Sequence, residues 1–357
     1  MSDTEQQRQR LESTLSSARR DLAKARNEAH FADAIEQVTR RKAALPEHRA
    51  GLERLRSRGY AWRPELEVDL STAEGEVDAL LNALREDSRD AEYALRSRFE
   101  RAERASDRIH GDVLNDEDEI EEMSAAVDDL EKAVDAAEKR LTAQAKPYND
   151  RVDGVVRRLK ELHWTLDQFD AASFEMRPEE NPVAAAKATW EDLPGDPDGC
   201  PGLLLFTDLR VRFEQREEVV TKKKFFFFTA EKEDVQAIQL DEPVGNLLAS
   251  DDATRGMVFK DQLLTFRWAD KASAPSSTTF KLDSGSAKDW DDVVEMLMSG
   301  DINRFRVDGD AAPSNAGAPV DWPRSCQGCG SAMPAPVKGQ TVLACPYCGN
   351  EHQVTLA

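Results

Sequence analysis

The first half of the chain, from about residue 4 to residue 172, repeats its apolar residues at alternating spacings of three and four. This period places them along one side of an α-helix and is typical of the heptad seam of a coiled coil. Alanines in the seam allow neighbouring helices to approach closely. Three runs carry the pattern: Leu11, Leu15, Ala18, Leu22, Ala25, Ala29 and Ala32; Leu66, Leu70, Ala73, Val77, Leu80 and Leu84; Ile120, Met123, Val127, Leu130, Val134, Ala137 and Leu141.

Turn-forming residues divide this half into three helices. Gly59 and Pro64 interrupt the pattern first, and Asn115 with Asp116 interrupts it again. At the rise of an α-helix the three pieces would each be about 75 to 85 Å long, so we expect an antiparallel three-helix coiled coil in which the first and third helices run parallel. The expected helices span residues 4–58, 64–114 and 116–172.

Prolines inside these ranges predict local distortion, because proline removes a helical hydrogen bond. Pro46, with Gly51 nearby, is expected to kink or break the first helix, and Pro147 is a second candidate in the third helix. After Pro147 the seam resumes as Tyr148, Val152, Val155, Leu159, Leu162, Leu166 and Phe169.

After about Met176 the pattern changes to short apolar or alternating runs separated by Gly, Asp, Pro and Ser, which is typical of an antiparallel sheet. One amphipathic helix follows at residues 286–300, with Trp290, Val293, Val294 and Leu297 on one face. Residues 178–309 are therefore expected to form one β-domain closed by a C-terminal helix.

Within this domain a strand ending at Trp190 is followed by "GLLLFTDLRVRFEQ". The stretch resembles the bacterial pleckstrin-homology (PH)/GRAM-like group, in which a Gly-x-Leu-x-x-Thr-x-x-Arg pattern marks the second and third strands. Here the pattern falls on Gly202, Leu204, Thr207 and Arg210. The resemblance implies a docking domain for lipids or proteins, and it transfers no ligand-binding residue to this chain.

The stretch from Lys222 to Phe228, "KKKFFFF", permits two interpretations. As a membrane-inserting hairpin it would offer lysines to anionic headgroups and phenylalanines to the interface. As a sheet strand it would send two phenylalanines to each face, so the second face would have to be covered by the closing helix or the coiled coil. We favour the strand, and we keep the peripheral membrane contact as an alternative.

A Gly/Pro/Ala-rich linker at residues 310–321 precedes a segment, residues 322–357, with the pattern Cys-x2-Cys-x15-Cys-x2-Cys. Cys326, Cys329, Cys345 and Cys348 have the spacing of two knuckles that close on one tetrahedral ion, and the segment resembles the zinc-ribbon family. A closed four-sulfur set predicts structural Zn²⁺, with iron or a redox thiol pair as alternatives. Each pair is followed by a glycine, Gly330 and Gly349.

Other candidates for chemistry carry less weight. His352 could replace a zinc ligand, but we favour an exposed strand residue, and Cys200 is interpreted as a turn cysteine rather than a reactive thiol. The other histidines are scattered through the helical half, and we find no nucleophile elbow and no phosphate-binding loop. "NDEDEIEE" lacks the glycine and spacing of a calcium loop. We therefore expect no enzymatic activity. The scattered histidines are His30, His48, His110 and His163.

Charge bears on the choice of partner. The net charge of −21 disfavours a general nucleic-acid coat, and residues 321–357 carry two acids and two bases. Residues 116–138 hold eleven Asp/Glu against one lysine, and the first helix is the basic partner available to them. No segment approaches about 18 uninterrupted apolar residues, and the N-terminus lacks a signal-peptide core, so we expect a cytoplasmic protein.

The sequence thus predicts a multidomain α + β protein that acts as a cytoplasmic scaffold or adaptor. The coiled coil (residues 1–172) would provide reach or homo-oligomerisation, while the PH/GRAM-like domain and the zinc ribbon would dock protein partners whose identity the sequence does not give. Weak contact with anionic membranes is an alternative that the sequence leaves open. The alternatives are a nucleic-acid-associated factor acting through the ribbon and a peripheral membrane adaptor using Lys222–Phe228.

Overall fold

The computed structural model describes residues 3–177, 180–196, 198–222, 231–256 and 260–307, and beyond them 320–321, 323, 325–328, 330, 333, 342–345, 350–353 and 355–356. Its contacts divide the chain into two compact units, Met1–Leu52 with Glu65–Leu159, and Glu53–Pro64 with Lys160–Ala357. We call them the helical unit and the β unit. All three boundaries fall inside or beside helices, whereas the sequence placed the division after residue 172.

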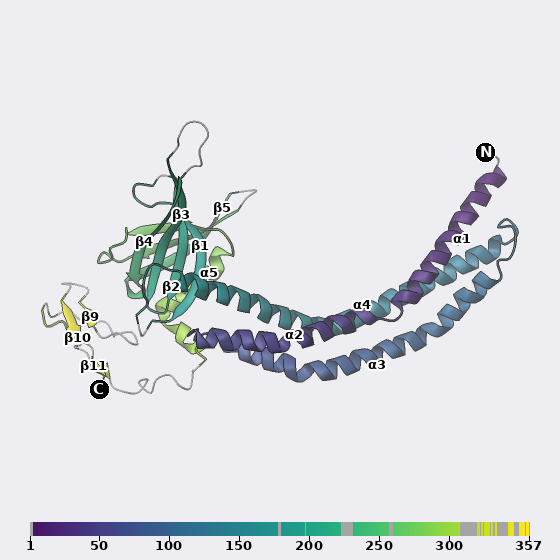
Figure 1. Cartoon of the computed structure of the whole chain (residues 1–357), viewed down its shortest axis with the longest axis horizontal. Coiled ribbons are helices and arrows are strands. Elements are labelled where there is room, and N and C mark those ends of the chain that lie inside the picture. Colours follow the sequence, from purple (N-terminus) through teal and green to yellow (C-terminus); the bar gives the residue numbers. More distant parts are fainter. Residues whose placement is uncertain are drawn as a thin grey trace. The chain divides into compact units, whose positions relative to one another are not determined.

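The architecture is mixed α + β, with four long helices before a seven-stranded sheet (Figure 1). The helices are α1 (Asp3–Glu28), α2 (Ala32–Ser57), α3 (Glu65–Asp107) and α4 (Glu117–Asp170). None of the helices in the described part of the chain combines the length and apolar composition needed to cross a membrane.

The expected single helix at residues 4–58 is in fact two helices, and the predicted break at Pro46 was wrong. The chain leaves the helix between Ala29 and Phe31, where Phe31 is buried and has a positive φ of 48°. The spacing of buried residues changes at this point, because Phe31 lies only two positions after Ala29 instead of three or four. Pro46 lies inside α2 and Pro147 inside α4. Helix on both sides of these prolines persists because buried neighbours such as Leu45 and Tyr148 pack it in place.

Ion pairs show the directions of the helices within the helical unit. Arg10 of α1 pairs with Glu121, and further along the chain Arg41 of α2 pairs with Asp153, so α1 and α2 run parallel to α4. Arg98 of α3 pairs with Asp129 of α4, and the earlier Glu76 pairs with the later Arg151, so α3 is antiparallel to α4. These are the predicted directions, while the supercoiling implied by the heptads stays a prediction.

The predicted seams form the apolar interior of the helical unit. One cluster joins Leu11 and Leu15 of α1, Ala102 and Ala105 of α3, and Met123 of α4 with their neighbours. The pattern fails at Ala32, which is exposed. Leu22, Leu80 and Ala137 are only half-buried, and Leu81 takes the buried place next to Leu80. Every residue of the seam that resumes after Pro147 is buried.

Two helices share the acidic start of α4. Gln7 and Arg10 of α1 bind Glu117 and Glu121, as the basic character of the first helix predicted. Arg98 of α3 and Arg108, just beyond the end of α3, also bind acids of this run. The sequence prediction was therefore incomplete, since it assigned the whole run to one partner.

The β unit contains an antiparallel sheet whose strand order is β4-β3-β2-β1-β7-β6-β5. Its strands are β1 (Pro182–Trp190), β2 (Cys200–Thr207), β3 (Arg210–Lys222), β4 (Glu231–Pro243), β5 (Leu247–Arg255), β6 (Asp261–Trp268) and β7 (Ser277–Leu282). A 3₁₀ turn at Val244–Asn246 joins β4 to β5. Helix α5 (Ala287–Ser299) closes the domain and is followed by the 3₁₀ helix η2 (Asp301–Phe305).

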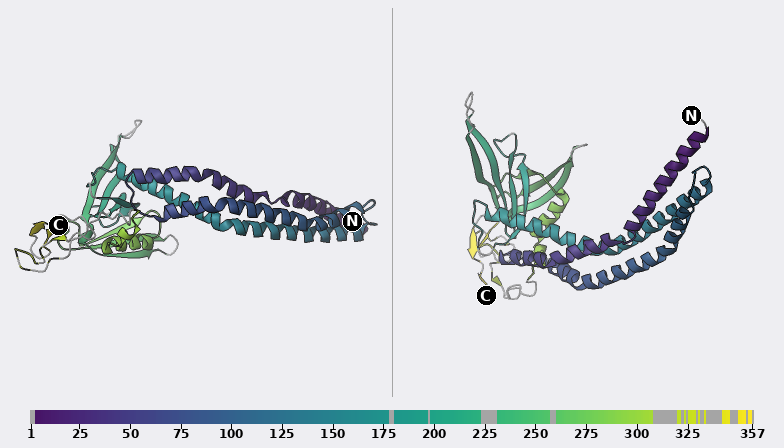
Figure 2. Two further views of the ribbon diagram at one scale, coloured as in Figure 1. Left: turned by 90° about the horizontal axis from the view of Figure 1, so that it is seen from below. Right: turned by 45° about the vertical axis from the view of Figure 1, so that its right-hand side comes forward.

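The ribbon of this sheet curves over on itself (Figure 2), and aromatic side chains fill the interior that it encloses. Phe213 of β3 and Phe280 of β7 are three strands apart in the sheet, which would separate them by about 14 Å if it were flat. Their ring centroids are 5.2 Å apart, and those of Phe206 (β2) and Phe266 (β6) are 6.2 Å apart. Trp290 of α5 stacks on Phe206, so the predicted apolar face of this helix covers the core.

The outer face of the first strands is covered by the end of α4. Phe169 packs with Ala185 of β1 and with Leu203 and Leu205 of β2, and Trp164 and Phe174 lie alongside. The end of α4 thus covers an apolar face of β1 and β2, whereas the cover that the sequence led us to expect was for the strand at Lys222–Phe228. Phe225–Phe228, Lys223 and Lys224 lie outside the described residues, so the strand interpretation of that stretch stays a prediction.

The C-terminal segment contains two small antiparallel pairs. Strand β9 (Val342–Ala344) pairs with β10 (Glu351–Gln353), and β8 (Val320–Asp321) pairs with β11 (Thr355–Leu356).

Candidate functional site

The first candidate site lies where the two cysteine pairs were predicted to close on an ion. Cys326 and Cys345 are both 2% exposed and share one cluster with Met333 and Leu343. The two knuckles, 19 positions apart in the sequence at these cysteines, thus contribute to a single interior. Cys329 and Cys348 lie outside the described residues, so the structure leaves the complete ligand set a prediction.

Backbone geometry around Cys326 is that of a chain curling around sulfur. The N–H of Gly328 donates to Cys326 Sγ at 3.3 Å, and the N–H of Gly330 donates to the Cys326 carbonyl at 2.8 Å. Gly330 has φ +76°, the left-handed conformation expected from its place after the pair. On the second knuckle the Cys345 N–H donates to the Asn350 carbonyl at 2.8 Å.

This donor set suits a soft metal ion. The two buried sulfurs, of which Cys326 Sγ receives a backbone N–H, would hold Zn²⁺ through thiolate ligands, and the ion would cross-link the two knuckles. Within the described residues, which contain only two of the four cysteines, no group of three His, Cys, Asp or Glu side chains is placed to hold a metal. Cys326 and Cys345 are consistent with the predicted site and do not complete it.

His352 was expected to be an exposed strand residue. The strand is confirmed, but the predicted exposure was wrong. It lies in β10 and is only 6% exposed. Its Nε2 is 3.2 Å from Cys326 Sγ. Sequence spacing missed the contact because the alternation of a three-residue strand does not show which face is covered.

The motif that suggested a PH/GRAM-like domain has a structural role in this fold. A Cβ added to Gly202 would lie 2.2 Å from the carbonyl oxygen of Glu214, so only glycine allows β2 and β3 to approach this closely. The buried Thr207 hydroxyl accepts the Arg210 N–H at 2.9 Å and closes the turn between these strands. Arg210 reaches across to β4, where its Nη2 donates to the Asp241 carbonyl at 2.8 Å.

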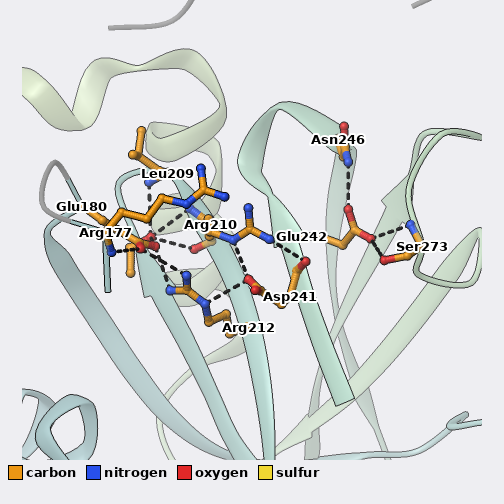
Figure 3. A network of polar contacts seen from close by, with 10 residues as sticks. Arg177, Glu180, Leu209, Arg210, Arg212, Asp241, Glu242, Asn246 and Ser273 are labelled. Carbon is orange, nitrogen blue, oxygen red and sulfur yellow. Dashed lines mark hydrogen bonds and ion pairs between the residues drawn. The ribbon is translucent and has the colours of Figure 1, made fainter. Parts of the chain in front are cut away.

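A buried ion pair, which we call the Glu180–Arg212 lock, forms the centre of the polar network in Figure 3. Arg212 Nη1 and Nη2 donate to the two carboxylate oxygens of Glu180 at 2.7 and 3.1 Å. The Thr207 hydroxyl donates to Glu180 Oε1 at 2.6 Å, and the Arg177 N–H donates to Oε2 at 3.1 Å. Burial alone would raise the pKa of Glu180, but these hydrogen bonds outweigh it and hold the pKa below its ordinary value.

Arg212 has two further contacts. Its Nε lies 2.9 Å from Asp241 Oδ1, an ion-pair contact without the angle of a hydrogen bond. Its guanidinium carbon lies 4.2 Å from the centre of the Phe174 ring. The side chain therefore links β3, β4 and the segment between α4 and β1.

Other buried carboxylates also bind the chain's own groups. Glu242 accepts the N–H groups of Ser273 and Ala274, at 2.5 and 3.1 Å, and the side-chain amide of Asn246 at 2.8 Å. Glu214 accepts the Ser173 N–H at 2.6 Å. For both acids burial would raise the pKa, yet the donated hydrogen bonds hold it below its ordinary value.

A joint that the sequence did not predict fixes residues 58–63 to the β-domain. The indole N–H of Trp62 donates to the Pro182 carbonyl at 2.9 Å, and the Arg306 guanidinium lies 5.0 Å from the Trp62 ring centre. The Arg63 N–H donates to the Phe305 carbonyl at 2.9 Å. Arg58 binds Asp167 and Asp170 near the end of α4. The only sequence signal was a pair of aromatics, Tyr60 and Trp62, inside a turn.

A cavity of about 490 Å³ opens beside the sheet, lined by residues that include Trp190, Pro194, Leu240, Asp241 and Pro275. It contains no grouping of catalytic side chains among the described residues. Cys200 is fully buried at the start of β2, and burial raises the pKa of its thiol to about 11. The thiol is therefore protonated at neutral pH, as expected for an inert cysteine, although it begins a strand rather than lying in a turn.

The chain matches no protein-family model, and no curated protein is similar enough to count as a relative.

Proposed function

We propose that the protein is a non-enzymatic cytoplasmic scaffold or adaptor. Its long helices would provide reach or self-association, and its β-domain, which we interpret as PH/GRAM-like, would dock a partner. A C-terminal zinc ribbon, held by structural Zn²⁺ on Cys326, Cys329, Cys345 and Cys348, would supply a second protein contact.

The observation that carries this proposal is the use made of buried charge. The buried charged residues in the described part of the β-domain are Glu180, Arg212, Glu214, Glu242 and Asp291, and each one is bound by other groups of the chain. Perturbed carboxylates often mark catalytic sites, but here their hydrogen bonds hold strands and loops together. This supports a docking module, and an antiparallel sheet with a closing helix is what the resemblance to the PH/GRAM-like group implies.

The zinc ribbon can be tested by elemental analysis of the purified chain. We expect about one zinc per chain, because four cysteines complete one tetrahedral site. The double variant Cys326→Ser/Cys345→Ser should lose it, while circular dichroism at 222 nm stays unchanged because the linker separates the ribbon from the helices. Wild-type protein without bound metal would refute the ribbon.

The adaptor role can be tested by affinity capture with the same pair of proteins. We expect a partner that wild type retains and the double-cysteine variant releases, together with self-association in sedimentation equilibrium of both. A nucleic-acid titration is the decisive comparison, because a submicromolar, salt-sensitive affinity would favour the nucleic-acid-associated alternative. Flotation with anionic liposomes tests the Lys222–Phe228 alternative, and we expect wild type and the Lys222→Ser/Lys223→Ser/Lys224→Ser variant to remain unbound.

A further inference from the structure

We propose that His352 is a positioning residue of the ribbon's metal site, which it serves by donating an Nε2–H···S hydrogen bond to the thiolate of Cys326. The inference rests on the proposed zinc ribbon and assigns a role to a residue outside the four-cysteine pattern. Its effect would be to tie the strand that follows the second knuckle to the first cysteine of the first knuckle.

The geometry supports this contact from both sides. His352 Nε2 and Cys326 Sγ are 3.2 Å apart, both residues are buried, and 26 residues separate them in the chain. His352 is held in place by β10, where it pairs with Leu343 of β9. Leu343 belongs to the same cluster as Cys326 and Cys345, so the imidazole reaches the sulfur from the wall of that cluster.

A metal-bound thiolate in such surroundings needs hydrogen-bond donors. The side chains of Met333 and Leu343 offer none, and a buried negative charge without donors is costly. Gly328 supplies one N–H to Cys326 Sγ at 3.3 Å, and His352 is placed to supply another. Groups that donate to metal ligands in this way fix the ligand's orientation and strengthen metal binding.

A hydrogen bond fits the contact better than direct ligation does. The four cysteines would already complete a tetrahedral set, and an Nε2 that binds metal has no proton to give. We therefore assign His352 Nε2 as the donor and Cys326 Sγ as the acceptor of this contact.

The test uses full-length protein loaded with zinc and three variants. His352→Leu removes the donor and keeps an apolar side chain, whereas His352→Gln places an amide N–H near the position of Nε2 and is a poor zinc ligand. Gln353→Ala, an exposed change in the same strand, is the control. We expect zinc to transfer to a chromogenic chelator about 10-fold faster or more from His352→Leu, with His352→Gln and the control within about 3-fold of wild type.

Nitrogen-15 NMR of zinc-loaded wild type gives a direct readout, with the His352 signal assigned by its absence from His352→Gln. We expect the Nε2–H tautomer, and we expect Co²⁺-loaded His352→Leu to keep a tetrahedral spectrum with shifted charge-transfer bands. A metal-coordinated Nε2, or loss of the tetrahedral spectrum in both variants, would make His352 a ligand and overturn the inference. Unchanged release from His352→Leu would overturn it while leaving the zinc ribbon intact. If wild-type protein binds no metal, both the proposed zinc ribbon and the role of His352 are refuted.

Discussion

The two units use the same chemical pair, arginine with a carboxylate, in opposite surroundings. In the helical unit Arg41 and Asp153 form a pair whose side chains are 27% and 57% exposed. In the β-domain Arg212 and Glu180 form a pair whose side chains are 4% and 0% exposed. An exposed pair contributes little to stability, whereas removing one partner of a buried pair leaves an uncompensated charge in the interior. Each ion pair of the helical unit thus contributes little to stability, whereas we expect the folding of the β-domain to depend on the lock.

The apolar interiors differ in the same sense. The helical unit packs leucines and alanines along seams, while the β-domain gathers Trp190, Phe206, Phe213, Phe266 and Phe280 in one cluster. All six tryptophans of the chain lie outside Met1–Leu52 and Glu65–Leu159. Tryptophan fluorescence therefore reports on the β unit alone, and circular dichroism at 222 nm reports mainly on the helices. The comparison can be tested unit by unit.

The largest effect is expected from breaking the Glu180–Arg212 lock on one side. Arg212→Leu should lower the free energy of unfolding of the β-domain by about 3 to 5 kcal/mol, because Glu180 stays buried without its counter-charge. Urea unfolding followed by tryptophan fluorescence measures this loss. The matched change in the helical unit is Arg98→Leu. It should lower the free energy of unfolding of that unit, followed by circular dichroism at 222 nm, by less than about 1 kcal/mol.

A double variant sharpens this prediction. Glu180→Met/Arg212→Leu removes both charges, and replacing a whole buried pair by apolar groups is often close to neutral, so we expect it to recover much of the lost stability. A single variant that costs no more than Arg98→Leu would mean that exposure does not distinguish the two sets of pairs.

Acid should act on the β-domain before it acts on the helices. Hydrogen bonds hold the pKa values of Glu180, Glu214 and Glu242 below the ordinary value of 4.5, despite their burial. Their contribution to stability is complete above that value and is lost as the pH falls through the lowered folded-state values. Asp208 opposes this, because burial raises its pKa and favours the protonated folded form in acid.

Fluorescence and circular dichroism recorded from pH 7 downward check this order. We expect the β-domain to lose unfolding free energy below about pH 4.5, where three lowered carboxylates outnumber one raised carboxylate. In the helical unit protonation also relieves repulsion among the eleven acids of residues 116–138, so the 222 nm transition should change less. Earlier loss of the helical signal would contradict the comparison.

Periodicity explains which elements could be predicted from the sequence. The helix seams and the amphipathic helix α5 repeat apolar residues at spacings of three and four. This local pattern correctly placed Leu66, Leu130 and Leu297 in the interior. The sequence did not predict the helix break at Phe31 because the break contains neither glycine nor proline. It shows only as a change in the spacing of the buried seam residues. Pro46 misled because packing on both sides of a proline can hold a helix together.

Contacts between residues far apart in the chain left no such pattern. Glu180 and Arg212 are separated by 32 residues, Trp62 and Pro182 by 120, and Cys326 and His352 by 26. Each depends on which strand edge or loop the fold brings opposite, which composition and spacing do not encode. The cysteine spacing predicts a metal site because metal ligation imposes a local rule of its own, and the structure shows that Cys326 and Cys345 share one cluster.

Glycine-to-alanine substitutions should change the free energy of unfolding in opposite directions in the two units. In Gly202→Ala the new Cβ would lie 2.2 Å from the Glu214 carbonyl oxygen, and we expect a loss of about 1 to 3 kcal/mol or more as β2 and β3 separate. Gly75 lies in α3, where a Cβ added to it would meet nothing within 4 Å, so Gly75→Ala should add about 0.5 to 1 kcal/mol. Tryptophan fluorescence measures the stability change of Gly202→Ala, and circular dichroism measures that of Gly75→Ala. A loss of stability in Gly75→Ala as well would refute the assignment of Gly75 to an open helix surface.

The smallest effect is expected for Arg41 and Asp153, and its dependence on salt is the informative part. Arg41 Nη2 lies 2.8 Å from Asp153 Oδ2, and hydrogen bonding to Arg41 lowers the pKa of Asp153, yet solvent reaches both side chains. A double-mutant cycle with Arg41→Gln and Asp153→Asn should give a coupling below about 1 kcal/mol that declines further at about 1 M salt, where charges are screened within about 3 Å. The same cycle with Arg212→Leu and Glu180→Met should give a larger coupling that salt hardly changes, because ions do not reach the buried pair. Two couplings with the same salt dependence would show that exposure does not separate the two units after all.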